Sequence, residues 1–315
     1  MTVIRNVIIT GATSFIGIYL LQELLRHGCK ITALVRKDSR NAGKLPRHEH
    51  LSVVLADLFD KDYIKQILND EKIDVFYHLA WGGIRAPERD ERCLQENNYK
   101  LTMSAVQLAG ELGCNTFIGT GSQAEYGLCT GKITENYPVH PVTEYGKAKL
   151  RACQEGAKLA VATDMNFIWA RIFSLYGDFD YSGTLIMSSL GKMLHNEPIS
   201  LTACSQKWDF LHVKDAAGGL RMLGEASCPA GIYNLASGIS RPLKEFVLQI
   251  RQITKSKSDL RFGAVPYGKE GIISFEPVVD KLKVAAGWQP KIQFTDGIEE
   301  IFNNIKQREI QNENN

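Results

Sequence analysis

Short apolar runs alternate with helical patterns over residues 1–173, and this alternation constrains the fold more than any other feature of the sequence. The apolar runs are typical of buried strands, and they lie at 6–10, 30–35, 51–56, 74–80, 116–121 and 166–173. The helical patterns between them lie at 15–28, 60–72, about 94–113 and about 143–163. Strand–helix–strand units of this kind pair their strands in parallel and place helices on both faces. The sequence therefore predicts an α/β fold with a doubly wound parallel sheet.

The second half of the chain follows a looser pattern. Beyond residue 174, proline and glycine punctuate shorter elements, which predicts a smaller C-terminal α/β domain over 174–305. We expect some of these later segments to return to the main sheet. The last residues, 306–315, are polar, and we expect this tail to fray.

Composition excludes several classes of partner. Apolar residues make up 44% of the 315 residues, enough for a sizeable core, and a net charge of +2 favours neither nucleic acid nor an anionic membrane. No apolar stretch approaches the length that spans a membrane. The seven cysteines are odd in number and contain no CxxC pair. We therefore expect free thiols in a reducing cytoplasm, without a disulfide framework or a metal site.

A glycine-rich turn, "TGATSFIG" (10–17), joins the first expected strand to the first expected helix. Gly11 permits a tight turn, and Gly17 allows helix and strand to approach closely. The helix N-terminus then presents free N–H groups and a positive dipole end to a pyrophosphate. Ser14 replaces the usual middle glycine, and its small side chain could donate a hydrogen bond. The turn predicts a Rossmann-type dinucleotide-binding domain over 1–173.

The end of the second strand favours one form of the dinucleotide. Arg36 and Lys37 stand where NAD-binding folds usually carry an acidic residue for the ribose hydroxyls. Two cations favour a 2′-phosphate, so we expect NADP(H), with NAD(H) as the alternative. Asp57, after the third strand, is a candidate acceptor for the adenine amino group or a cap for the helix beginning near Asp60.

A tyrosine and a lysine four residues apart, Tyr145 and Lys149, project from one face of an expected helix. A free phenol has a pKa near 10, too high for easy proton exchange at neutral pH. A nearby ammonium, together with the cationic ring of an oxidised nicotinamide, would favour the phenolate. The spacing suggests a proton donor with its electrostatic partner.

Further motifs in order along the chain resemble the extended short-chain dehydrogenase/reductases, the NAD-dependent epimerase/dehydratase family that modifies nucleotide sugars. These motifs are "TGATSFIG" (10–17), "HLAW" (78–81), "TGSQAEYG" (120–127), "YGKAK" (145–149), "ARIFSLYG" (170–177), "WDFLHVKD" (208–215), "YNLASG" (233–238) and "DKLKVAAGWQP" (280–290). The resemblance covers nearly the whole chain. It implies a substrate-binding role for most of 174–305 and a homodimer formed through the helices near 94–113 and 143–163.

The resemblance also implies site residues. It gives a catalytic triad of Ser122, Tyr145 and Lys149, in which Ser122 polarises the substrate oxygen and Lys149 holds the nicotinamide ribose. The expected cofactor contacts are Gly11, Ser14, Phe15, Ile16, Gly17, Arg36, Lys37, Asp57, Leu58, Leu79, Ala80, Thr120, Tyr145, Lys149 and Ile172. The expected substrate contacts are Trp81, Arg85, Gln123, Ser174 and Trp208.

Three departures from the family pattern bear on the substrate. Ser174, Asp178 and Trp208 replace an asparagine, a proline and an arginine that the family usually has there. Trp208 either stacks on a base or packs in the core. Arg85 either contacts the sugar or diphosphate or is solvated. We interpret His78 and His212 as structural.

The reaction expected from the resemblance is reduction of a nucleotide-linked 4-keto-deoxyhexose. Family dehydratases carry an acidic pair directly after the serine or threonine, whereas Gln123 and Ala124 occupy those positions here. Glu125 is displaced by one residue and would point elsewhere on a strand-like segment. The alternatives are a 4-epimerase with permanently held NAD+, a less favoured 4,6-dehydratase, and a non-catalytic dinucleotide sensor.

Overall fold

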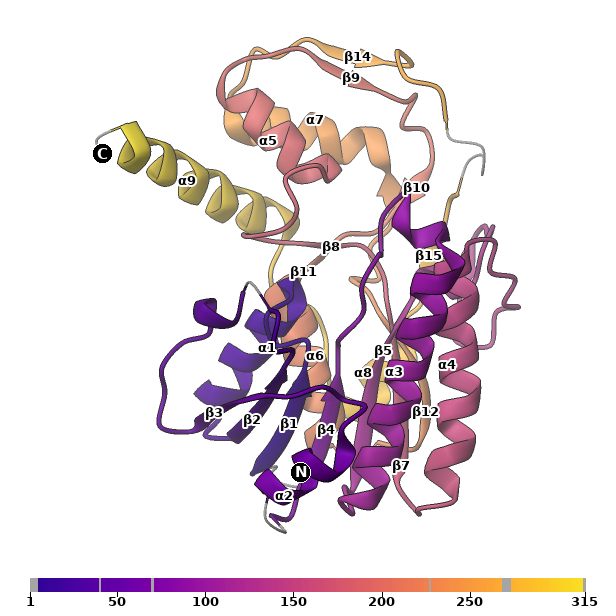
Figure 1. Cartoon of the computed structure of the whole chain (residues 1–315). Coiled ribbons are helices and arrows are strands. Elements are labelled where there is room, and N and C mark those ends of the chain that lie inside the picture. Colours follow the sequence, from indigo (N-terminus) through magenta and orange to yellow (C-terminus); the bar gives the residue numbers. More distant parts are fainter. Residues whose placement is uncertain (1–4, 40, 69–70, 227, 268–272, 314–315) are drawn as a thin grey trace.

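Seven parallel strands form a single sheet, which lies in the lower part of Figure 1. The structure is a computed structural model that describes residues 5–39, 41–68, 71–226, 228–267 and 273–313. Their order across the sheet is β12 (Gly231–Leu235), β7 (Asn166–Ile172), β5 (Thr116–Ser122), β4 (Val75–His78), β1 (Asn6–Thr10), β2 (Lys30–Val35) and β3 (Leu51–Leu55). The chain winds outward from β1 in both directions, so its topological switch point lies between the carboxyl ends of β1 and β4. The predicted doubly wound parallel sheet is confirmed.

Helices bury both faces of the sheet, because successive strand residues point to opposite sides. Val7 and Ile9 of β1 join one apolar cluster, and Ile8 joins the other. The first cluster contains side chains of α1 (Phe15–Arg26), α6 (Val213–Glu225) and α8 (Asp280–Ala286). The second contains side chains of α2 (Lys61–Leu68), α3 (Arg92–Glu111) and α4 (Glu144–Val161). Strand β12, α6 and α8 thus bring late segments of the chain back to the sheet.

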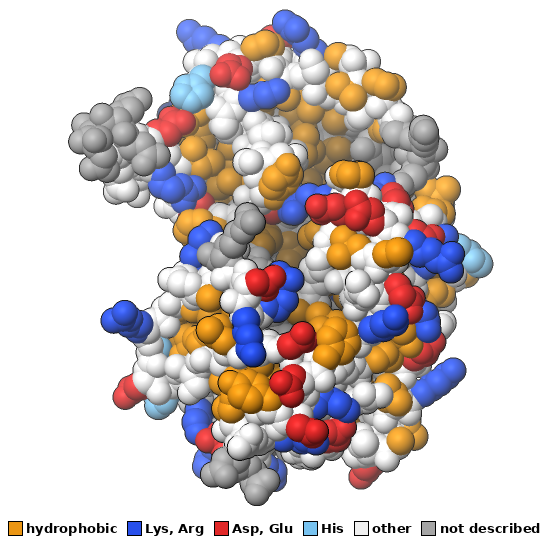
Figure 2. All heavy atoms as spheres, in the orientation of Figure 1, with side chains coloured by type: hydrophobic (Ala, Val, Ile, Leu, Met, Phe, Trp, Pro, Cys, Tyr) orange, Lys and Arg blue, Asp and Glu red, His pale blue; other side chains and the backbone are white. Residues whose placement is uncertain are grey.

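A separate lobe lies above the sheet in Figure 1. It has its own apolar cluster and contains α5 (Leu185–Leu194), α7 (Leu243–Thr254), α9 (Phe294–Glu313) and the paired strands β9 (Ile199–Leu201) and β14 (Leu260–Phe262). The face drawn in Figure 2 is hollowed between this lobe and the sheet, with charged and hydrophobic side chains around the hollow.

Short elements connect the two parts. The short paired strands are β6 (Lys132–Ile133) with β15 (Glu276–Pro277), β8 (Leu175–Tyr176) with β11 (Leu211–His212), and β10 (Lys207–Trp208) with β13 (Arg241–Pro242). Single 3-10 turns lie at η1 (Ala42–Lys44), η2 (Glu88–Asp90) and η3 (Gln123–Glu125). Within the described ranges, no helix combines the length and apolar character needed to cross a membrane.

The C-terminal helix differs from the expected frayed tail. Helix α9 continues through Glu313, and residues 314–315 lie outside the described part of the chain. Arg308 donates two hydrogen bonds, of 2.6 and 2.9 Å, to the buried carboxylate of Asp178, and Asn304 donates a third at 3.1 Å. Tyr19 of α1 donates to the Asp178 carbonyl at 3.0 Å. The polar sequence of the tail could not reveal a partner 130 residues away.

We expect Arg308→Ala to lower the free energy of unfolding by about 1–2 kcal/mol, because it leaves a buried carboxylate with one donor fewer than it needs. Urea unfolding of the purified protein measures this change. Gln307→Ala, at an exposed position of the same helix, is the control and should stay within about 0.5 kcal/mol of wild type. Equal stability of the two variants would contradict the anchoring of α9.

Candidate active site

The residues expected to hold a dinucleotide gather along one edge of the sheet. All but Tyr145 and Lys149, which lie on α4, stand at or just after the carboxyl end of a strand, where open parallel sheets bind ligands. The strands that contribute are β1 (Gly11 to Gly17), β2 (Arg36, Lys37), β3 (Asp57, Leu58), β4 (Leu79, Ala80), β5 (Thr120) and β7 (Ile172). The topology therefore brings these expected contacts, which span 162 positions of the sequence from 11 to 172, to a common surface.

The glycine-rich turn lies at the switch point. Gly11 has φ +72° and touches the loop after β4, since a Cβ built on it would lie 2.6 Å from the backbone nitrogen of Ala80. A Cβ on Gly17 would collide with the Gly11 carbonyl oxygen. Ser14 caps α1 by accepting the Gly17 N–H at 3.1 Å. The first-turn N–H groups of Phe15 and Ile16 have no intrahelical carbonyl, so the turn fits a pyrophosphate.

Two cations and two carboxylates follow β2 and β3. Arg36 and Lys37 are exposed; Arg36 lies 3.7 Å from Asp38, and the Lys37 ammonium lies 5.5 Å from the ring centroid of Tyr63. Asp57 is exposed and accepts the Phe59 N–H at 3.0 Å.

The proposed capping role of Asp57 is wrong. Helix α2 begins at Lys61, and Asp60 caps it by accepting the Tyr63 N–H at 3.3 Å. Asp57 lies too early in the chain to reach the first turn and forms its own turn with Phe59. Its expected contact with adenine stays a prediction.

Lys149 is a buried cation at the carboxyl end of β5. Only 3% of the residue is exposed, and its ammonium donates to the Thr120 carbonyl at 2.6 Å. The same ammonium lies 3.8 Å from the ring centroid of Trp81 and 5.9 Å from that of Tyr145. Burial lowers the pKa of Lys149 to about 7, and the charge of Glu125 opposes that shift.

The three residues expected to form the triad lie together. Ser122 ends β5, and its hydroxyl is a hydrogen-bonding neighbour of the Tyr145 phenol. Burial raises the pKa of Tyr145 to about 12, the hydrogen bond with Ser122 lowers it, and the charge of Glu125 raises it. At neutral pH this tyrosine is a neutral phenol and therefore a proton donor.

The expectation that the Lys149 ammonium acidifies the phenol is not met in the protein alone. Lys149 loses its proton near pH 7, and Tyr145 loses its proton near pH 12. In an alkaline titration of the protein alone, the lysine is therefore neutral before the phenol ionises, and its charge does not lower the pKa of Tyr145. Burial of both groups causes this reversal, because a low dielectric disfavours each charged form.

Glu125 is a buried charge beside the triad that sequence reasoning missed. The segment after Ser122 is the 3-10 turn η3, and the expected strand-like conformation is wrong. Glu125 is fully buried and pairs with Arg171 of β7 at 2.7 Å. The spacing of Ser122 and Glu125 matches a capping box, which forms here and which signals a turn after the strand.

Three expected substrate contacts lie near the triad or at its rim. The Trp81 indole donates to Gln95 at 2.9 Å and lies edge-on to Tyr145. The Gln123 side-chain oxygen is buried without a hydrogen-bond partner in the described part of the chain. Arg85 is not simply solvated, because its guanidinium lies 3.6 Å from Asp180 and stacks on the ring of the next residue, Tyr181.

The remaining expected contacts lie toward the upper lobe. The Ser174 carbonyl accepts the Leu211 N–H at 2.9 Å, which joins β11 to the segment after β7. Trp208 is partly buried, with its ring 4.8 Å from that of Phe275, so it packs as a core aromatic. A role of either residue toward substrate stays a prediction.

The two histidines have structural contacts. His78 is buried between two threonine hydroxyls, Thr10 at 2.8 Å and Thr102 at 3.0 Å, and burial lowers its pKa to about 3. His212 caps α6 by accepting the Lys214 N–H at 3.2 Å, and burial lowers its pKa to about 4. Both rings are therefore neutral at physiological pH.

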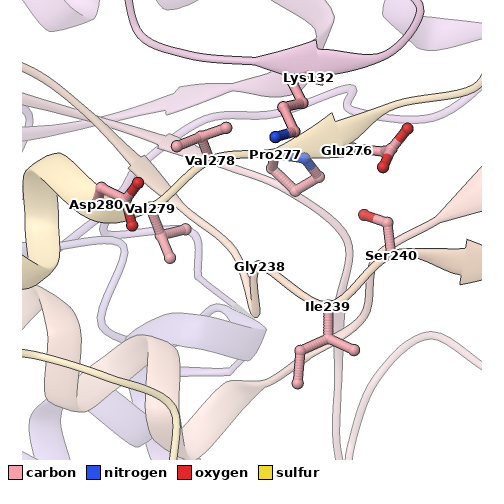
Figure 3. A pocket seen from close by; sticks show the side chains of 9 residues that line it. All are labelled: Lys132, Gly238, Ile239, Ser240, Glu276, Pro277, Val278, Val279 and Asp280. Carbon is pink, nitrogen blue, oxygen red and sulfur yellow. The ribbon is translucent and has the colours of Figure 1, made fainter.

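A pocket of about 450 Å³ opens elsewhere, between the β6–β15 pair and the loop after β12 (Figure 3). Its lining residues are Lys132, Gly238, Ile239, Ser240, Glu276, Pro277, Val278, Val279 and Asp280. None belongs to the triad or to the glycine-rich turn.

Several named proteins match most of the length of this chain. CDP-abequose synthase of Salmonella muenchen is 27% identical over 305 residues, which cover 95% of this chain and 97% of that protein. The dTDP-6-deoxy-L-talose 4-dehydrogenase (NAD(+)) of Aggregatibacter actinomycetemcomitans is 29% identical over 250 residues, which cover 77% and 88%. A UDP-N-acetyl-alpha-D-glucosaminuronate decarboxylase of Bacillus cytotoxicus is 25% identical and covers 98% and 99%.

Solved structures share the fold. The UDP-N-acetylglucosamine 4-epimerase of Methanobrevibacter ruminantium superposes with a TM-score of 0.86 at 20% identity, over 98% of this chain and 100% of that one. The UDP-glucose 4-epimerase of Thermotoga maritima gives 0.84 at 17% identity, over 96% and 99%. A sequence model described as the NAD dependent epimerase/dehydratase family matches residues 7–236, most of the chain. The chain is therefore an enzyme of the NAD dependent epimerase/dehydratase family, whose members act on nucleotide sugars.

Proposed function

We propose that this enzyme reduces the 4-keto group of a nucleotide-linked deoxyhexose with NADPH. The observation that carries the proposal is the grouping of Ser122, Tyr145 and Lys149 at the carboxyl end of β5. Tyr145 is a neutral phenol at neutral pH, which is the form that a proton donor to a carbonyl needs. Ser122 lies beside it as a second hydrogen-bond donor to the same oxygen.

Reduction needs one hydride at the carbonyl carbon and one proton at the carbonyl oxygen. The reduced nicotinamide supplies the hydride when bound. Tyr145 gives the proton to the oxygen while Ser122 polarises the carbonyl, and the resulting phenolate gains from a protonated Lys149 nearby. Lys149 titrates near 7, so it can hold or release a proton at physiological pH. The unpartnered Gln123 oxygen is a suitable acceptor for a sugar hydroxyl.

The preference for NADP(H) rests on the two exposed cations at the end of β2. A 2′-phosphate brings two negative charges and three acceptor oxygens, which Arg36 and Lys37 can meet. The nearest carboxylate, Asp38, leans toward Arg36 at 3.7 Å. Because this carboxylate offsets part of the positive charge of Arg36, NAD(H) is the second candidate.

The relatives support redox chemistry at C4. One is named a 4-dehydrogenase of a dTDP-linked 6-deoxyhexose, and another is named for the synthesis of a CDP-linked sugar. A 4-epimerase is the runner-up, because two structural neighbours carry that name. Dehydration is disfavoured, since Glu125, the first carboxylate after Ser122, points into the protein and is paired with Arg171.

A homodimer through α3 and α4 is part of this proposal. The two helices pack side by side on one face of the sheet (Figure 1). Their surface carries the Arg151 guanidinium on the Tyr99 ring, 3.7 Å from its centroid, with Glu96 and Glu155 as ionic partners. Sedimentation of the purified enzyme tests this state directly.

Tyr145→Phe should lower kcat at least 100-fold, because it removes the proton donor and little else. The assay follows NADPH absorbance with nucleotide-linked 4-keto-6-deoxyhexoses as substrates. Tyr137→Phe, a tyrosine outside the triad, is the control and should keep wild-type turnover. Wild-type turnover by Tyr145→Phe would refute the catalytic assignment.

Replacing both Arg36 and Lys37 by serine should weaken NADP+ binding at least tenfold and change NAD+ binding less than threefold. Each lost charge-assisted hydrogen bond to the 2′-phosphate costs about 1.5–3 kcal/mol. Calorimetric titration gives both affinities. Lys30→Ser removes one cation at the opposite end of β2 and is the control for a general loss of positive charge. Stoichiometric NAD+ retained by the purified wild-type protein would contradict the reductase and favour the epimerase.

Lys149→Met should gain stability relative to wild type at low pH and lose that gain as pH rises. The folded pKa of Lys149 is about 7 and its ordinary value is 10.5. Between these values the unfolded chain holds a proton that the folded protein lacks, so wild-type stability rises with pH. Between pH 6.5 and 9, the free energy of unfolding of wild type should rise by about 2 kcal/mol relative to that of Lys149→Met.

Urea unfolding at the two pH values measures this shift. Lys147→Met, an exposed lysine on the same helix, is the control and should give a pH-independent difference. A pH-independent difference for Lys149→Met as well would mean that Lys149 is not a depressed, buried amine.

A further inference from the structure

A fully buried carboxylate lies directly behind the triad. Glu125 accepts the backbone N–H of Ser122 at 2.8 Å and the indole N–H of Trp169 at 2.9 Å on one oxygen. Its other oxygen accepts the Arg171 guanidinium at 2.7 Å. All three contacts are donated to Glu125, as an ionised carboxylate requires. The carboxylate therefore fixes the backbone of a triad residue.

The end of β5 is shaped to admit this carboxylate. A Cβ on Gly121 would lie 2.5 Å from the Glu125 oxygen, so a side chain at this position would displace the carboxylate. Arg171 is 2% exposed, and its guanidinium stacks 4.5 Å above the Tyr126 ring. A buried ion pair costs desolvation that its attraction repays only with such additional hydrogen bonds. Its location against the triad suggests a role beyond stability.

Lys149 has no carboxylate of its own among its described contacts. Its ammonium meets the Thr120 carbonyl and the face of Trp81. Glu125 and Lys149 share the Trp169 indole: its N–H donates to Glu125 at 2.9 Å, and the Lys149 ammonium lies 5.8 Å from its ring centroid. The negative charge of Glu125 accordingly raises the pKa of Lys149. The titratable and charged groups that face Glu125 are Arg171 on β7, Tyr126 after η3, and Tyr145, Lys149 and Cys153 on α4. Arg171 also donates to the backbone carbonyl of Glu135 at 3.5 Å, while the Glu135 carboxylate accepts the Asn234 N–H.

We propose that Glu125 is a positioning residue of the active site, which fixes the backbone of Ser122 and provides the counter-charge of the Lys149 ammonium. The catalytic part of this proposal rests on the proposed function, whereas the electrostatic part concerns the protein alone. The charge of Glu125 raises the proton affinity of both Lys149 and Tyr145. It therefore favours a protonated amine beside a neutral phenol, the state that can donate a proton to a carbonyl.

Titration of Lys149 by carbon-13 NMR tests the electrostatic part without substrate or cofactor. The signal comes from protein with labelled lysine and is assigned by its loss in Lys149→Met. Glu125→Gln should lower the midpoint of Lys149 by about one pH unit, because an opposing charge is removed. Glu125→Asp keeps the charge and should leave the midpoint within about 0.3 units of wild type.

Two further variants keep the test decisive. Trp169→Phe removes one donor to Glu125 without changing any charge and keeps an aromatic ring near Lys149, so it should move the midpoint much less than Glu125→Gln does. If Glu125→Gln unfolds because Arg171 loses its partner, Glu125→Gln/Arg171→Gln removes both charges and should still lower the midpoint. An unchanged midpoint in a folded variant without the Glu125 charge would overturn the proposal.

Kinetics test the catalytic part. Glu125→Gln should lower kcat at least tenfold with the KM for the sugar nucleotide within about threefold, and its pH profile should shift to lower pH with the Lys149 midpoint. If Glu125→Gln lowers the Lys149 midpoint but the wild-type enzyme reduces no nucleotide sugar, the counter-charge role of Glu125 is supported and the proposed function is wrong. An active reductase whose midpoint and kcat ignore Glu125→Gln would sink the positioning role alone.

Discussion

A lysine ammonium buried at the carboxyl edge of a parallel sheet is the constraint around which this site is arranged. Lys149 meets one carbonyl and one indole face, and burial brings its pKa to about 7. The same burial keeps Tyr145 neutral. The pair can therefore donate a proton. The topological switch point of the sheet lies between β1 and β4, at the same carboxyl edge.

The rest of the structure supports that arrangement from distant parts of the chain. Gly11 lets the turn after β1 touch the loop after β4, the loop that continues into Trp81 beside Tyr145. Glu125 fixes the end of β5 by accepting the Ser122 N–H, and Arg171 pairs with its carboxylate. Asp178 and Arg308 join the loop after β8 to the C-terminal helix, so the upper lobe is anchored near the same edge.

Much of this could be predicted, and the failures have a common cause. Period and turn residues are local properties, so the first six strands of the sheet, the glycine turn and the Tyr145–Lys149 spacing could be predicted from the sequence. The seventh strand, β12, was expected only as an unspecified later segment that returns to the sheet. The C-terminal helix and the buried Glu125 depend on partners 130 and 46 residues away. The direction of the Tyr145 pKa depends on burial, which a spacing of four residues does not reveal.

Transfer of isotope from the cofactor to the sugar tests the central claim most directly. NADPH carrying deuterium at the transferable position is mixed with a nucleotide-linked 4-keto-6-deoxyhexose, and the product is analysed by mass spectrometry and NMR. The account predicts one deuterium at C4 of the sugar for each NADP+ formed. Product without deuterium, formed with no net oxidation of NADPH, would contradict it.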